Sequence, residues 1–310
     1  MKNKNAQLLP ALLTMVLWGT LFPMVKLGFS LSLVSGIGDT LLFAGLRFLI
    51  AGAIIAAFSA IRDPKSYSQA SGSILPILLA GAFAVILHYG FSYVGLTMTD
   101  SSKTAILKQT GALFYVSFSF LFIREDRPTV RKILAAIIGF IGIMALELNG
   151  GGGFKFAVGD LLIIVSSFCT VISNVICKGV FKKVSPVTAT AISQFFGGAV
   201  LTVIGLILGG DIYLGTIASI LTFAYIILAS VVSYCVWYGG VKRGELSRLF
   251  IVKFTEPLFA CVFSAFILGE DILKIKYLIA FLLISAGVVI AENRGGFAKI
   301  FHCGKKEKNA

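Results

Sequence analysis

Long apolar blocks separated by short polar links dominate the chain. A helix of about 20 apolar residues is long enough to cross the hydrocarbon core of a bilayer, and none of the links is long enough to hold a separate domain. The pattern predicts an all-α integral membrane protein with ten transmembrane helices. We expect these spans at roughly 8–29, 38–61, 73–95, 101–123, 130–149, 157–180, 187–209, 215–239, 246–268 and 273–293.

Composition agrees with a membrane protein and excludes an ordinary soluble domain. Hydrophobic residues make up 57% of the chain and charged residues only 13%, whereas soluble domains carry about 25% charged residues. The net charge of +13 would also suit a nucleic-acid-binding protein. However, with the N-terminus inside, about 18 Lys and Arg side chains fall in inner links and tails and about 4 in outer links, as the positive-inside rule requires. We therefore expect a plasma-membrane protein with both termini cytoplasmic and no nucleic-acid partner.

No enzyme signature is present. The chain lacks a Walker loop, a GxSxG motif, an HExxH motif and a CxxC pair among its five cysteines. We expect no catalytic activity, no metal and no cofactor.

An internal repeat organises the spans. A shift of 145 residues aligns Tyr89–Gly151 with Tyr234–Gly296 without a gap, and about 18 of roughly 63 aligned positions are identical. Each repeat holds five spans, so the second copy must enter the membrane inverted, an arrangement typical of secondary transporters. We predict a first repeat at 1–149, a Gly-rich connecting turn at 150–156, a second repeat at 157–294 and a basic cytoplasmic tail at 295–310.

Four stretches resemble the drug/metabolite transporter superfamily, specifically its ten-helix branch with two EamA domains. They are Trp18-Gly19-Thr20, Leu46-Arg47-Phe48, Thr255-Glu256-Pro257-Leu258-Phe259 and Ala286-Gly287-Val288-Val289-Ile290. The resemblance implies secondary-active or facilitative transport of small organic metabolites. Amino acids or related carboxylates lead, and export is the favoured direction. The alternative is a non-transporting membrane scaffold or sensor.

Two lysines occupy the same position in the two repeats. Lys108 and Lys253 each lie about seven residues into a span, so both fall within a few ångströms of the bilayer midplane. Charged groups at this depth are costly and commonly functional. We expect the pair to line one cavity and bind an anionic group of the substrate. The alternative is structural ion pairing, since Glu256 lies three residues from Lys253 on the same helix face.

Further polar and aromatic residues fall on the spans. Arg47 and Gln194, which occupy comparable places in spans two and seven, are candidates for substrate binding, as is Glu256. A structural role for Arg47 remains open beside ligand contact. The aromatic candidates for substrate stacking, which would otherwise pack between helices, are Tyr89, Tyr93, Trp237 and Tyr238.

Proton coupling has two candidates, His88 and Glu256. His88 titrates near neutrality when unperturbed. The short four-helix relatives use a glutamate in their first span, where this chain has no acid, so their coupling mechanism does not carry over.

Prolines and glycines bear on helix shape. Pro257 is expected to bend span nine or simply to aid packing, while its repeat counterpart, Ala112, has no such effect. Gly205-x-x-x-Gly209 favours close packing inside the chain over dimerisation, so a monomer and a homodimer both remain open.

Acidic residues such as Asp100 and Glu270 are expected to act as solvated caps at helix ends.

Overall fold

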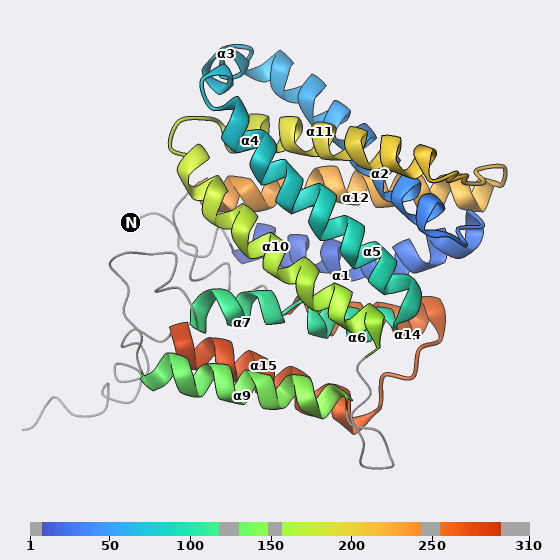
Figure 1. The fold of residues 1–310 in the computed structure, drawn as a ribbon, viewed down its shortest axis with the longest axis vertical. Coiled ribbons are helices and arrows are strands. Elements are labelled where there is room, and N and C mark those ends of the chain that lie inside the picture. The colour runs from blue at the N-terminus through green and yellow to red at the C-terminus, as the bar shows by residue number, and fades with distance from the viewer. Residues whose placement is uncertain (1–7, 118–129, 148–156, 243–254, 293–310) are drawn as a thin grey trace, which may run out of the picture.

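The computed structural model describes residues 8–117, 130–147, 157–242 and 255–292. Every regular element in these ranges is helical, which confirms the predicted all-α class (Figure 1). The helices are α1 (Leu8–Leu31), α2 (Ile37–Arg62), α3 (Lys65–Ser71), α4 (Ile74–Gly81), η1 (Ala82–Leu87), α5 (His88–Met98), α6 (Ser101–Leu107), α7 (Thr110–Ser117), α9 (Val130–Glu147), α10 (Val158–Val180), α11 (Pro186–Ile207), α12 (Ile217–Lys242), α14 (Glu256–Leu268) and α15 (Ile275–Glu292).

Six helical stretches in the described ranges are long and apolar enough to cross a membrane. They are Leu12–Leu31, Ile37–Arg62, Ile74–Met98, Val158–Cys177, Pro186–Ile207 and Ile217–Trp237. Helices α9, α14 and α15 contain shorter apolar runs. Large apolar side chains such as Phe266 and Leu75 lie exposed on the outer surface, where hydrocarbon would cover them. The chain is therefore a multi-pass membrane protein.

The helices pack in a regular pattern. α2 and α11 lie side by side at one end of the bundle in Figure 1, and α9 and α15 lie side by side at the other. Between them, α1 packs against α12 and α10 packs against α5, while α6 contacts α14. Exchanging α1 with α10, α5 with α12, α2 with α11 and α9 with α15, as the 145-residue repeat requires, leaves the contacts among these eight helices that are named here unchanged.

Glycines carry the contact between α2 and α11. These glycines recur seven residues apart on each helix, and a β-carbon on any of them would collide with the backbone of the other helix or of the turn that follows α11. Gly205, half of the GxxxG motif, packs in this way against Leu42 of the same chain, which fits the expected internal use of the motif. The five glycines are Gly38, Gly45 and Gly52 on α2 and Gly198 and Gly205 on α11.

The expected continuous helix at 101–123 is wrong in its described part. The helix breaks at Lys108 and Gln109, between α6 and α7. The amide of Gln109 bonds to the carbonyl oxygen of Ile106, three residues back rather than four, so the last turn of α6 tightens. Gly111 then lets α7 approach the backbone of Ser167 on α10. Hydropathy gave no sign of this break, because apolar residues flank it on both sides.

Two further helices depart from the expected pattern. The turn Ala82–Leu87 preceding α5 is a π-helix, a form often found at functional sites. Pro257 lies in the first turn of α14, where proline is tolerated because its missing N–H has no helical partner. Within the described residues Pro257 therefore begins a helix rather than bending one.

Candidate functional site

Arg47 of α2 is the most deeply buried basic side chain in the described residues, at 1% exposure. Its Nε and Nη2 donate to Ser230 Oγ of α12 at 3.0 and 2.7 Å. The hydroxyl of Ser230 donates in turn to the carbonyl oxygen of Ile226, so it is oriented as an acceptor. No carboxylate forms an ion pair with Arg47 within the described ranges. A charge held only by neutral groups is costly to bury.

Three aromatic rings surround the Arg47 guanidinium. Its central carbon lies 4.6 Å from the ring centre of Phe48, 5.5 Å from Tyr89 and 5.7 Å from Tyr93. Cation–π contacts of this kind lower the cost of the buried charge and fix the plane of the guanidinium. These contacts anchor Arg47 between α2, α5 and α12, whereas its ligand contact stays a prediction.

Tyr89 and Tyr234 join the two sides of the site. Their hydroxyl groups hydrogen-bond to each other, although 145 residues separate them, the same interval as the sequence repeat. Trp18 of α1 contacts both Tyr234 and Trp237, with ring centres 5.9 and 5.0 Å apart. Its indole N–H donates to Ser233 Oγ at 2.9 Å. The aromatic candidates Tyr89 and Trp237 thus belong to one cluster with Trp18.

Lys108 approaches the same cluster from the break between α6 and α7. Its Nζ lies 5.4 Å from the ring centre of Tyr89 and 5.2 Å from that of Phe22. Tyr89 therefore has two cations near its ring, Lys108 and Arg47. Glu256, at the start of α14, is buried at 5% exposure and acts electrostatically on Tyr89. The cluster thus holds two cations and one carboxylate around a tyrosine pair.

The remaining candidates divide into three groups. His88 is buried, and its Nδ1 lies 2.7 Å from the carbonyl oxygen of Ser166 on α10, so this nitrogen carries hydrogen and ties α5 to α10. Tyr93 and Gln194 are buried, each with an oxygen that has no hydrogen-bond partner within the described part. Lys253, and the side chain of Tyr238 on α12, lie outside the described residues.

Sequence reasoning missed Ser230 and did not count Trp18 as a site residue. Trp18 belongs to the Trp-Gly-Thr stretch that carried the family resemblance, which was the available signal. Ser230 lies 183 residues from its partner Arg47, and nothing in the sequence distinguishes it from other serines in apolar spans.

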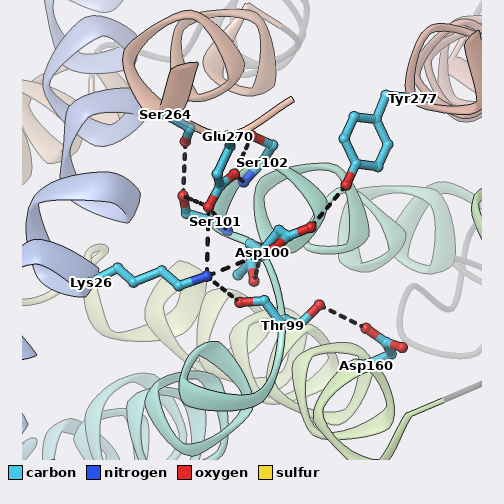
Figure 2. A network of polar contacts seen from close by, with 10 residues as sticks. Lys26, Thr99, Asp100, Ser101, Ser102, Asp160, Ser264, Glu270 and Tyr277 are labelled. Carbon is cyan, nitrogen blue, oxygen red and sulfur yellow. Dashed lines mark hydrogen bonds and ion pairs between the residues drawn. The ribbon is translucent and has the colours of Figure 1, made fainter. Parts of the chain in front are cut away.

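A second polar cluster ties helix ends together at the turn between α5 and α6 (Figure 2). We call it the Glu270 network. Glu270 Oε1 accepts from the amide and hydroxyl of Ser101, both at 2.8 Å, and Oε2 accepts from the amide and hydroxyl of Ser102, at 3.0 and 2.6 Å. Its other members, shown in Figure 2, are Lys26, Thr99, Asp100, Ser264 and Tyr277.

The Glu270 network joins residues before position 149 to residues after position 157. Lys26 Nζ lies 3.5 Å from Glu270 Oε1 and donates to the carbonyl oxygen of Thr99 at 2.9 Å. The hydroxyl of Tyr277 donates to Asp100 Oδ2 at 3.1 Å. Glu270 therefore differs from the expected solvated cap, because it caps α6, a helix in the other half of the chain.

Hydrogen bonding controls the charge of Glu270. Burial by itself would raise the pKa of this carboxyl group, but the hydrogen bonds from Ser102 and Ser101 outweigh it and hold the pKa below its ordinary value. Glu270 is therefore ionised at neutral pH. A second ion pair, between Lys103 Nζ and Asp160 Oδ2 at 2.8 Å, ties α6 to α10 beside the network.

Comparison with known proteins assigns the family. A profile described as the EamA-like transporter family matches residues 6–147 and again residues 157–291. An uncharacterized transporter of Archaeoglobus fulgidus is 28% identical over 86% of this chain and 91% of its own length. A Salmonella typhimurium protein named "Probable amino-acid metabolite efflux pump" is 24% identical over 90% of this chain and 92% of its own.

A solved crystal structure supports the same fold. It superposes with a TM-score of 0.67, covers 97% of this chain and 100% of its own, and is 19% identical in sequence. The family match spans nearly the whole chain in two copies, and the resemblance stated from the Trp-Gly-Thr and Leu-Arg-Phe stretches is confirmed. The chain belongs to the EamA-like transporter family and is a multi-pass membrane transporter.

Proposed function

We propose that the protein is a secondary-active or facilitative carrier that exports small organic carboxylates, amino acids among them, across the plasma membrane. Arg47 carries the proposal: a guanidinium at 1% exposure, with no carboxylate ion pair in the described ranges. The free-energy cost of burying the Arg47 charge is offset if a substrate carboxylate is its physiological partner. Charge-assisted hydrogen bonds between Arg and a carboxylate are about twice as strong as hydrogen bonds between neutral groups.

The cluster around Tyr89 suits such a ligand. Lys108 provides a second cation on the same ring as Arg47, and Trp18 and Trp237 provide apolar faces for an organic substituent. Glu256 provides a carboxylate for an ammonium group. The name of the Salmonella typhimurium relative supports amino acids as the leading class and export as the direction.

Alternating access follows from two inverted five-helix halves, 1–149 and 157–294, in ten spans. Three observations support these halves: the family profile matches twice, the pairs α2–α11, α9–α15, α1–α12 and α10–α5 map onto one another when the halves are exchanged, and Tyr89 bonds to its repeat counterpart Tyr234. Two residues at equivalent positions of the two halves can contact each other only close to the pseudo-twofold axis that relates the halves, so Tyr89 and Tyr234 lie near that axis. The Glu270 network lies at the helix ends that the charge bias assigns to the outside, so this conformation is closed to the exterior.

The carrier is testable by reconstitution. We expect purified protein in liposomes to move a radiolabelled amino acid with saturable kinetics. Lys108→Met should reduce that flux about tenfold or more, because it removes a cation from the Tyr89 ring without removing its volume. Lys274→Met, which removes an exposed lysine just before α15, is the control and should leave flux unchanged.

Equal flux for Lys108→Met and wild type would contradict the assigned role of the cluster. A non-transporting sensor or scaffold, the competing function, would instead show ligand-dependent thermal stabilisation across a metabolite panel without any flux. Proton coupling through His88 or Glu256 predicts that an imposed pH gradient drives uphill uptake, and that His88→Gln or Glu256→Gln leaves only downhill movement.

A further inference from the structure

A pocket lies between α4 and η1 on one side and α10 and α11 on the other. Apolar side chains form most of its wall, and Tyr234 of α12 also lines it. Because Tyr234 also hydrogen-bonds to Tyr89, the pocket and the cationic cluster share this tyrosine and are neighbours in the bundle. Among the described residues, its polar lining consists of Ser173, Thr190, Ser193 and Gln194 besides Tyr234, and none of these described lining residues is charged.

The three small hydroxyl groups of this pocket are all oriented as acceptors. Ser173 Oγ donates to the carbonyl oxygen of Ala80 at 3.1 Å. Thr190 Oγ1 donates to Pro186, and Ser193 Oγ donates to Ile77, at 2.7 and 3.2 Å. A hydroxyl has one hydrogen to donate, so each of these oxygens faces the pocket only with lone pairs.

Gln194 adds a fourth acceptor. Its side chain is 3% exposed and lines the pocket, and its Oε1 has no hydrogen-bond partner within the described part of the chain. A buried carbonyl oxygen left without a donor costs free energy that a bound donor would recover. The pocket therefore combines an apolar wall with acceptors and offers no full charge.

We propose that this pocket binds a hydrogen-bond donor, an amino or hydroxyl group, on the solute whose carboxylate lies at Arg47 and Lys108. The assignment rests on the proposed function and narrows it to carboxylates that carry such a donor beside an aliphatic body. A carboxylate without the donor would leave Gln194 Oε1 unpaired and would bind more weakly.

Cys177 offers a direct test, because it lines the pocket and is half-buried. In a variant with Cys177 as its single cysteine, we would measure protection from N-ethylmaleimide by three solutes of one carbon skeleton: leucine, its 2-hydroxy analogue and 4-methylpentanoate. We expect leucine and the hydroxy acid to protect at concentrations about five- to tenfold lower than the parent acid, the value of one hydrogen bond.

Substitutions in the pocket locate the effect. Gln194→Leu and, independently, Thr190→Val should reduce that preference to below about twofold. Thr202→Val is the matched control, since Thr202 makes the same bond to the residue four positions back on the same helix, α11, but does not line the pocket. It should keep the full preference.

The outcomes separate this pocket from the general proposal. Equal protection by all three solutes, an unchanged preference in both pocket variants, or no protection by any solute overturns the pocket assignment. Flux measured in parallel decides the carrier function independently. Saturable leucine flux without protection of Cys177 would leave the carrier standing and the pocket assignment refuted.

Discussion

Replacing Glu270 by glutamine should open the end of the bundle that the Glu270 network closes. The substitution keeps the size of the side chain and removes its charge. Four hydrogen bonds from Ser101 and Ser102 end on the carboxylate, whose side chain is 11% exposed. A glutamine retains one acceptor oxygen and turns an NH2 group toward two donors.

The magnitude follows from these contacts. A hydrogen bond to a charged group contributes about 1.5–3 kcal/mol net, and about half of the four bonds are lost. The ion pair with Lys26, which is 30% exposed, adds little, about 0.5 kcal/mol. With partial solvent access, we expect a total loss of about 3 kcal/mol, which makes opening roughly 100-fold more frequent.

Hydrogen–deuterium exchange of the first turn of α6 measures this opening. The amides of Ser101 and Ser102 donate directly to Glu270, so their protection should fall by about that factor. Asp271→Asn is the control, because Asp271 caps only the amide of Leu273 at an exposed site. If these amides kept their protection in a correctly folded Glu270→Gln protein, the carboxylate would not be what holds this end closed.

Further predictions concern the same molecule. Because the pKa of Glu270 lies below its ordinary value, its stabilising contribution is complete above about pH 5 and is lost only as the pH falls through the lowered native pKa. The hydrogen–deuterium exchange rates of the α6 amides, corrected for their intrinsic pH dependence, should therefore be constant from about pH 5 to 8. A loss of amide protection at pH 6 would contradict this. Tyr89→Phe and Tyr234→Phe remove the same bond, so a double-mutant cycle read by thermal unfolding should show a coupling of about 1 kcal/mol, whereas additive effects would show no bond. Gly198→Ala should lower the melting temperature in detergent, because its methyl group meets the backbone of Leu49; Gly179→Ala, also on a helix but with open space, should be neutral or slightly stabilising, and equal effects would refute the close contact.

Hydropathy and charge bias predicted the helical class and the membrane location, because both depend only on local composition. Contacts between residues that are far apart in the sequence could not be predicted from local composition. Arg47 finds Ser230 only through folding, and Glu270 finds Ser101 169 residues away. The break at Lys108 was also hidden, because tertiary contact at Gly111, rather than composition, decides it. The seven-residue spacing of the glycines on α2 and α11 was a usable signal that hydropathy overlooks.

The glycine contact between α2 and α11 has a mechanical consequence. Backbone meets backbone there, so no side-chain rotamers must be exchanged when one helix turns slightly on the other. A contact of this kind permits small rotations between the two helices, whereas interdigitated side chains would have to change rotamers for the same rotation. In the carrier proposed above, the contact between α2 and α11 would therefore be the pivot between the two halves, and the Glu270 network would be the set of bonds that must break for them to separate.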